Sequence, residues 1–238
     1  MQNVIAIFQR ELGSYFDSPL AYIIIPVFLG LVGGFSLFFQ DVLASGLASM
    51  RTVFFWSAVS FLLLIPAVTM RLFAEEKRTG SIELLVTMPV TESEMVLGKY
   101  LAALCLMTTA LALTFTWPFT LYAFGSPDVG PLIGGYLGLF LLGAAFTAVG
   151  TAASALTSNQ VVSFLVALLG CLVPFVSGYA LARVPASLLP IVQYLSTEYH
   201  FDNLARGVVD SRNIIFYLSV VALFLHVAVF ALERRRLA

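Results

Sequence analysis

Long uncharged stretches alternate with short polar ones along this chain. Asp, Glu, Lys and Arg are absent from five runs, which lie between Asp17 and Asp41, Arg51 and Arg71, Lys99 and Asp128, Asp128 and Arg183, and Arg212 and Glu233. A helix needs about 20 apolar residues to cross about 30 Å of hydrocarbon. The run after Asp128 can hold two such helices, separated by the polar stretch 155–160. The pattern therefore predicts six transmembrane helices, near 20–39, 52–71, 98–124, 132–155, 161–181 and 214–232.

Composition supports a single transmembrane domain over residues 1–238. Hydrophobic residues make up 60% of the chain and charged residues 11%, whereas about a quarter of the residues of soluble domains are charged. We therefore expect an all-α integral membrane protein that contacts the lipid bilayer. The net charge of −1 offers no basic field for nucleic acid. Cys105 and Cys171 both fall inside predicted spans, where they act as small apolar residues.

The segment before the first span has the pattern of a helix in the membrane interface. Val4, Ile5, Phe8, Leu12 and Tyr15 recur at helical spacing, and the polar residues fall largely elsewhere. The alternative is a frayed N-terminus. We expect Ser18 to cap the first span, with Pro19 at its first position. The first span is too long and begins too late for the core of a cleaved signal peptide.

The distribution of Lys and Arg predicts the orientation. With the N-terminus inside, cytoplasmic segments hold Arg10, Arg71, Lys77, Arg78, Lys99, Arg234, Arg235 and Arg236. The outer segments hold Arg51, Arg183, Arg206 and Arg212. Basic residues concentrate on the cytoplasmic side of membrane proteins. We therefore predict a multi-pass protein of the bacterial cytoplasmic (inner) membrane with both termini in the cytoplasm.

The densest group of charges lies between the second and third spans. This stretch, 73–100, carries Glu75, Glu76, Lys77, Arg78, Glu83, Glu92, Glu94 and Lys99. We expect the helix of the second span to continue to about residue 78 and to end at Gly80, which readily adopts a left-handed backbone. A short helix would follow from Ser81 to Pro89. Thr91 and Glu94 then form a capping box that starts the third span.

This segment suits either of two roles. Its aliphatic side chains, bordered by charges of both signs, fit a cleft in a soluble partner. A loop whose aliphatic face lies on the membrane surface has the same pattern. Composition alone leaves both roles open.

A family resemblance favours the first role. The stretch "EEKRTGSIELLVTMPVTESEMVLGKYLAAL" resembles the run that follows the second span of ABC-2-type transporter permeases. The stretch 194–219 is similar to the same family before its last span. Within the family, the chain most resembles gliding-motility-associated permeases and those of nitrous oxide reductase maturation, a copper/sulfur export type. Ser81 stands where many members have Thr, and either hydroxyl can cap a helix.

The resemblance implies a membrane subunit that couples ATP hydrolysis elsewhere to export or to mechanical signalling. Implied partners are two copies of an ATP-binding subunit, a second permease chain (homodimer or heterodimer), and a periplasmic accessory protein as a further candidate. ATP and Mg would be bound by the ATP-binding subunit. The contact would be a coupling helix in the coupling segment, 73–97, through Glu75, Glu76, Lys77, Arg78, Gly80, Ser81, Ile82, Glu83, Leu84, Leu85, Met88 and Pro89.

We expect no catalytic, cofactor or metal site in the chain itself. A phosphate-binding loop needs G-x-x-x-x-G-K-[ST], but Ser93 replaces the first Gly before Gly98-Lys99, and Tyr100 follows. Secondary transport and intramembrane catalysis are the alternatives. The first usually shows internal repeats and charged sites at the midplane, and the second needs a nucleophile with a base, or a metal set.

Two groups of residues merit separate interpretation. His226 lies well inside a span, and we expect it to have a hydrogen-bonded packing role. Glu198, His200 and Asp202 resemble a metal set, but alternate residues do not share a helix face. We instead predict a short helix within an outer re-entrant or interfacial segment, 183–212, with a Ser196 cap, an Asp202–Arg206 pair and an end at Gly207. Glycines at helix-packing spacing predict packing surfaces, with the subunit interface as an alternative: Gly30, Gly34, Gly130, Gly134 and Gly138.

Overall fold

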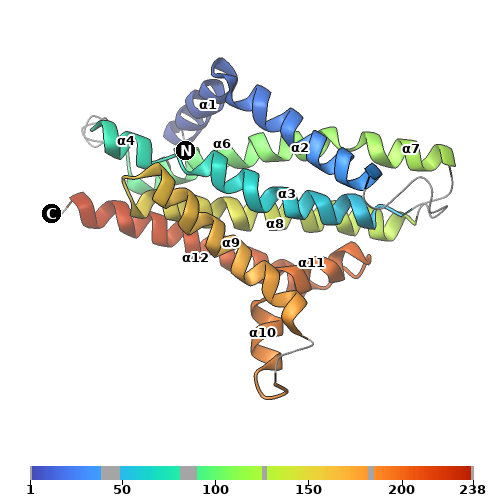
Figure 1. Ribbon diagram of the computed structural model, residues 1–238. Helices are drawn as coiled ribbons and strands as arrows, with labels where there is room; N and C mark the ends of the chain where they lie inside the picture. Colours follow the sequence, from blue (N-terminus) through green and yellow to red (C-terminus); the bar gives the residue numbers. More distant parts are fainter. Residues whose placement is uncertain (1, 39–48, 81–89, 125–127, 182–184, 237–238) are drawn as a thin grey trace.

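The computed structural model describes residues 2–38, 49–80, 90–124, 128–181 and 185–236. Across these ranges the regular elements are helices (Figure 1). In chain order they are α1 (Gln2–Asp17), α2 (Pro19–Phe38), α3 (Arg51–Thr69), α4 (Ala74–Thr79), α6 (Glu92–Leu113), α7 (Thr116–Phe124), α8 (Val129–Leu156), α9 (Gln160–Ala180), α10 (Leu189–Leu195), α11 (Thr197–Ala205) and α12 (Ser211–Arg236).

The predicted fold class is confirmed. Six helical segments of the described chain are long and apolar enough to cross a membrane, and they lie close to the predicted spans. The segment 1–18 contains the helix α1, which ends at Asp17. Ser18 accepts a hydrogen bond from the Leu20 amide at 3.4 Å, and Pro19 begins α2, as expected.

Helix α8 forms the centre of the bundle. Most of its residues are buried, whereas only a minority of the residues of α2, α9 and α12 are. It packs against α3, α9, α11 and α12. A side chain at Gly135 would collide with the ring of Phe54, and one at Gly150 would collide with Thr69. These glycines let α3 and α8 lie very close together.

Several of the predicted glycine packing surfaces lie within this chain. A side chain at Gly134 would meet the backbone of α11, and a Cβ on Gly138 would lie 3.2 Å from Phe201. Gly30 and Gly34 have nothing within 4 Å of such a Cβ among the described residues. The face of α8 around Gly134 and Gly138 is therefore an internal contact with α11.

The third span, predicted over 98–124, is divided into two helices by a turn. α6 ends at Leu113 and α7 begins at Thr116, so Pro118 falls in the first turn of α7, where its missing N–H removes no helical hydrogen bond. The Tyr136 hydroxyl donates to the Thr114 carbonyl at 3.0 Å. The same carbonyl also accepts from the Trp117 amide at 3.0 Å, so the Tyr136 bond adds a link from the break to α8.

The second span also ends earlier than predicted. α3 stops at Thr69, and the turn 70–73 separates it from α4. The Ser154 hydroxyl of α8 donates to the Met70 carbonyl at 3.2 Å and accepts from the Phe73 amide at 2.9 Å. These bonds replace those that a continuous helix would have made, so the break is stabilised by a neighbouring span.

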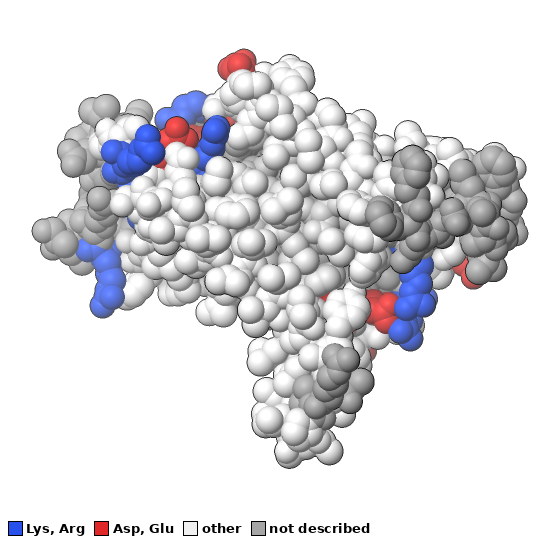
Figure 2. Space-filling view, in the orientation of Figure 1, with Lys and Arg blue, Asp and Glu red and all other residues white. Residues whose placement is uncertain are grey.

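Charged side chains gather toward two ends of the molecule. One end, called here the terminal end, holds α4 and both chain termini; α7 and α11 lie toward the opposite end (Figure 1). On the face seen in Figure 2, Lys, Arg, Asp and Glu lie mainly near these two ends, with a wide uncharged band between them. A protein that spans a membrane needs such a band.

Candidate functional site

A buried lysine joins three elements at the terminal end. The Lys99 side chain, on α6, is 1% exposed. Its Nζ lies 2.8 Å from Glu76 Oε1 of α4 and 3.0 Å from Glu11 Oε1 of α1, and 5.4 Å from the centre of the Phe73 ring. A buried ammonium group is stable only when it is paired. The position of Lys99 therefore depends on α1 and α4 together.

Arg10 completes a cluster with no net formal charge. Its guanidinium lies 2.7 Å from Glu11 and 3.7 Å from Glu76, and its side chain is 53% exposed. Arg10, Glu11, Glu76 and Lys99 are called here the charged junction. Lys99 is its buried member and Arg10 its solvent-facing member. We therefore expect the ion pairs of Lys99 to affect stability more than those of Arg10.

The charged junction favours the ionised form of the Glu11 carboxyl. Burial alone would raise the pKa of the Glu11 carboxyl, but the attraction of Lys99 and Arg10 outweighs burial and brings the pKa below its ordinary value. Glu11 is therefore ionised at neutral pH. The ion pair between Glu11 of α1 and Lys99 of α6 therefore does not depend on a shared proton.

A second set of contacts ties the start of the coupling segment to α8. Ser154 Oγ accepts from the Ala74 amide at 3.1 Å as well as from Phe73. These amides belong to the first turn of α4, where the helix itself supplies no acceptor. Lys77 is buried, and its Nζ donates to the Ala155 carbonyl in the last turn of α8. A cation is favourable at this end of a helix.

The far end of the coupling segment is anchored as well. The predicted capping box is present: the Glu94 amide donates to Thr91 Oγ1 at 3.3 Å, and the Thr91 amide donates to Glu94 Oε2 at 3.1 Å. Asn3 of α1 donates to the same Glu94 oxygen at 3.1 Å. The beginning of α6 is thus bound to the beginning of α1.

Close packing holds α1 on α6 between these polar contacts. A Cβ on Gly98 would lie 2.7 Å from Ile7 Cγ2 and 3.1 Å from the Val4 carbonyl oxygen. Only glycine leaves room for α1 at this distance. The segment that starts at α4 and ends at α6 therefore connects two anchored points.

The structure divides the predicted contact residues into three groups. Glu75, Arg78 and Gly80 are exposed, and Gly80 has the predicted left-handed backbone, with φ of 75°. Glu76 and Lys77 contact the rest of this chain, through the charged junction and α8. The predictions for Ser81, Ile82, Glu83, Leu84, Leu85, Met88 and Pro89 fall outside the described residues.

Sequence reasoning missed the charged junction. Lys99 was counted among the cytoplasmic basic residues and the charges of 73–100 but was given no partner, and Glu11 was not singled out at all. One indication was available, because Lys99 begins a long uncharged run and a lysine there needs a partner. Nothing in the sequence says that the partner lies 88 positions earlier.

The residues that resembled a metal set do not form one. No group of three or more potential ligands occurs among the described residues. His200 is buried between the Asn213 side-chain oxygen at 2.7 Å and the Tyr194 carbonyl at 3.0 Å. Asp202 pairs with Arg206, as predicted. The ring of His200 therefore holds α11 against the start of α12.

The remaining expectations for this region have mixed outcomes. Ser196 caps α11 by accepting from the Tyr199 amide at 3.2 Å, and Gly207 follows the helix with φ of 85°; both were predicted. The prediction for His226 was wrong. Its side chain is exposed on α12, because the apolar face that packs on α8 lies on the other side of that helix. Within the described chain we find no hydrogen-bond partner for its ring.

Comparison with protein families identifies the class. Residues 39–232 match the family model described as ABC-2 family transporter protein. The chain belongs to this family. The ABC-2 permease is thus the membrane component of an ABC transporter, and the family implies an ABC ATP-binding partner and a dimeric arrangement. A comparison with curated proteins gave no match.

Proposed function

We propose that this ABC-2 permease couples ATP hydrolysis by a separate subunit to movement of its spans, and that the ATP-binding subunit docks on residues 75–89. The charged junction carries the proposal. A loop that merely covers the membrane surface needs no buried ion pairs at its base, whereas a segment that transmits force needs firm attachment. Lys99 attaches this segment to α1 and α6, and Ser154 attaches it to α8.

The anchoring contacts suggest how a displacement is passed on. When ATP closes the partner dimer, the coupling helix moves, and both of its attached ends move with it. At one end Lys77 and Ser154 pull on α8; at the other, Lys99 and Glu94 pull on α1. In this proposal Glu75 and Arg78 form the charged rim of the contact, and Ile82, Leu84, Leu85 and Met88 are its apolar centre.

Two variants test docking and coupling separately. Leu84→Asp would bury an unpaired charge at the contact, at a cost of about 3–5 kcal/mol. We expect tagged permease to lose its ATP-binding subunit in affinity purification while it still inserts in the membrane; Leu84→Ile is the matched control. Gly80→Val should retain part of the docking but lower the ATPase activity of the complex, because a β-branched residue resists φ of 75°. Wild-type assembly and turnover in both variants would contradict the proposal.

We also propose that ATP hydrolysis belongs to the partner alone, which binds ATP and Mg. The stretch around Gly98-Lys99 lies in α6 and is covered by α1, which leaves no room for a phosphate-binding loop. The permease purified without other subunits should therefore hydrolyse no ATP. Native mass spectrometry of the complex should give two ATP-binding subunits and two permease chains, and it distinguishes a homodimer from a heterodimer.

The orientation remains part of the proposal. We place both termini and α4 in the cytoplasm and the protein in the bacterial inner membrane, since Lys and Arg are more numerous at that end. Reporter fusions after Leu156 and after Ala238 should both read as cytoplasmic. A periplasmic reading at the C-terminus would reverse the assignment.

The finer relationship to gliding-motility-associated and nitrous oxide reductase maturation permeases is a further proposal. It is supported by the stretch 194–219, which forms α11 and the start of α12 at the end opposite the coupling segment. Such a permease exports a substrate or passes force to a periplasmic accessory protein. Cross-linking from introduced cysteines in α10, followed by mass spectrometry, should recover that protein if force is transmitted.

A further inference from the structure

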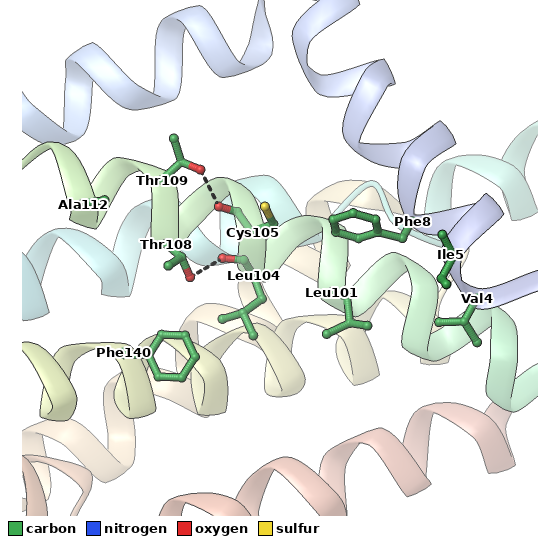
Figure 3. A pocket seen from close by; sticks show the side chains of 10 residues that line it. All are labelled: Val4, Ile5, Phe8, Leu101, Leu104, Cys105, Thr108, Thr109, Ala112 and Phe140. Carbon is green, nitrogen blue, oxygen red and sulfur yellow. Dashed lines mark hydrogen bonds between the residues drawn. The ribbon is translucent and has the colours of Figure 1, made fainter. Parts of the chain in front are cut away.

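An apolar groove runs along α6 beside the N-terminal helix. It has a volume of about 550 Å³ and lies between α1, α6 and the Phe140 ring of α8 (Figure 3). Val4, Ile5 and Phe8 form the α1 wall. This volume falls within the range of about 300–1,000 Å³ that is typical of sites for small organic ligands.

The groove exists because α1 and α6 diverge from a point of close contact. The two helices touch at Gly98, where a Cβ would lie 2.7 Å from Ile7. Beyond this point α6 continues through Leu101 and Leu104, while α1 leaves its surface (Figure 3). The charged junction fixes the angle between them, since Glu11 of α1 binds Lys99 of α6. The groove is therefore a built feature of the fold.

The walls offer almost no polar contact to a ligand. The Thr108 hydroxyl donates to the Leu104 carbonyl at 2.7 Å, and the Thr109 hydroxyl donates to the Cys105 carbonyl at 2.8 Å (Figure 3). Both hydroxyl hydrogens are thus used within α6. The remaining surface is aliphatic and aromatic, so the ligand is apolar along its length.

The length of the groove matches one leaflet of a bilayer. From Leu101 to Ala112 the groove follows α6 for about 16 Å at about 1.5 Å per residue. The hydrocarbon core is about 30 Å thick, so the groove covers about half of it. It begins next to the charged junction, where the chain leaves the apolar region. A ligand that enters here has its polar end at the membrane surface and its tail near the midplane.

We propose that this groove binds one acyl chain of a phospholipid from the leaflet at the terminal end. A helix from a second permease chain fits less well, because it would continue across the whole membrane and α1 closes the groove at its surface end. The bound chain fills the wedge between α1 and α6. The acyl chain thereby supports α1 from the membrane side. The charged junction holds α1 through the ion pair of Glu11 with Lys99. This inference is independent of ATP coupling.

Filling the groove tests the proposal. Thr108→Phe places a ring where the acyl chain would lie, and Ala112→Phe shortens the groove at its inner end. Leu165→Phe is the matched control, because Leu165 is exposed on α9, away from the groove. Each protein, purified in mild detergent from the same membranes, is examined by native mass spectrometry for retained phospholipid. Size-exclusion chromatography reports whether each variant is folded.

We expect wild type and Leu165→Phe to retain phospholipid to the same extent. The two groove variants should retain about tenfold less, which corresponds to about 1.4 kcal/mol. Equal retention by folded Thr108→Phe and Ala112→Phe proteins would overturn the proposal. Retention of detergent and no phospholipid by every protein, wild type included, would overturn it as well.

The free thiols provide a test for the competing occupant. Cys105 lines the groove, whereas Cys171 is fully buried, so a thiol cross-linker can join two permease chains only through Cys105. We expect no cross-linked dimer in native membranes. A cross-linked dimer that disappears in Cys105→Ala would show that a second copy covers the groove.

Discussion

The two ends of this permease hold their charges in different ways. At the terminal end, Lys99 is 1% exposed and binds carboxylates from two other helices. At the opposite end, Asp202 pairs with Arg206 of its own helix and with Arg51 of α3, and the two arginine side chains are 60% and 67% exposed. A buried ion pair that loses one member is strongly destabilised, whereas exposed pairs contribute little. We therefore expect the terminal end to be sensitive to single substitutions and the opposite end to tolerate them.

Glu198 illustrates the same contrast from the opposite end. It is partly buried, and burial together with the nearby Asp202 outweighs the attraction of Arg206 and Arg51 and raises the pKa of its carboxyl above the ordinary value. Glu11 is also partly buried, but Lys99 and Arg10 bring its pKa below that value. The surroundings of Glu11 thus favour its ionised form, whereas those of Glu198 disfavour it.

The largest expected effect follows from removing a partner of Lys99. Glu76→Ala leaves the buried ammonium with Glu11 alone, and we expect a loss of about 3–5 kcal/mol in stability. Thermal unfolding in detergent measures it. The control is Glu75→Ala, since Glu75 is the exposed neighbour, and its effect should stay within about 0.5 kcal/mol. Equal unfolding midpoints for the two variants would show that the charged junction does not contribute to stability.

A smaller effect is expected where α1 rests on α6. In Gly98→Ala the new methyl group would lie 2.7 Å from Ile7 Cγ2, so α1 must shift, at a cost of about 1–3 kcal/mol. Faster proteolysis within α1 and a lower unfolding midpoint should accompany the shift. Gly34→Ala, which has nothing within 4 Å of the new methyl group, is the control. An unchanged proteolysis rate and unfolding midpoint in Gly98→Ala would refute close packing at this contact.

The smallest effect is expected at the opposite end. Asp202→Asn removes the charge that both Arg206 and Arg51 contact, yet exposed pairs are worth about 0–1 kcal/mol. The unfolding midpoint should therefore change little at low salt and still less at high salt. A loss as large as that of Glu76→Ala would remove the contrast between the two ends.

Local features of the chain could be predicted because they depend on neighbouring residues. The absence of charge over about 20 residues locates a span, Thr91 and Glu94 form a capping box within one turn, and Gly80 and Gly207 both adopt the left-handed backbone that ends a helix. Each of these needs only a few positions of sequence. The six spans and the boundaries of the coupling segment follow from them.

The candidate site depends on distant partners, and for this reason the sequence did not reveal it. Lys99 and Glu11 are far apart in the chain, and Lys77 finds its acceptor on α8. Glu76 and Lys77 read as surface charges because four consecutive ionisable residues usually lie in water. His226 illustrates the opposite failure, since a polar residue inside a span suggested an internal partner and its ring instead faces outward.

The Ser154 hydroxyl has a consequence for protein engineering. It accepts from the Phe73 and Ala74 amides and donates to the Met70 carbonyl, although it lies 80 to 84 residues later in the chain, on α8. A chimera that receives only residues 70–99 from this permease has the sequence of the coupling segment but lacks the Ser154 hydroxyl, which sets the direction of α4. Such a graft should adopt the donor's angle only when its host offers a small hydroxyl residue at the end of its fourth span.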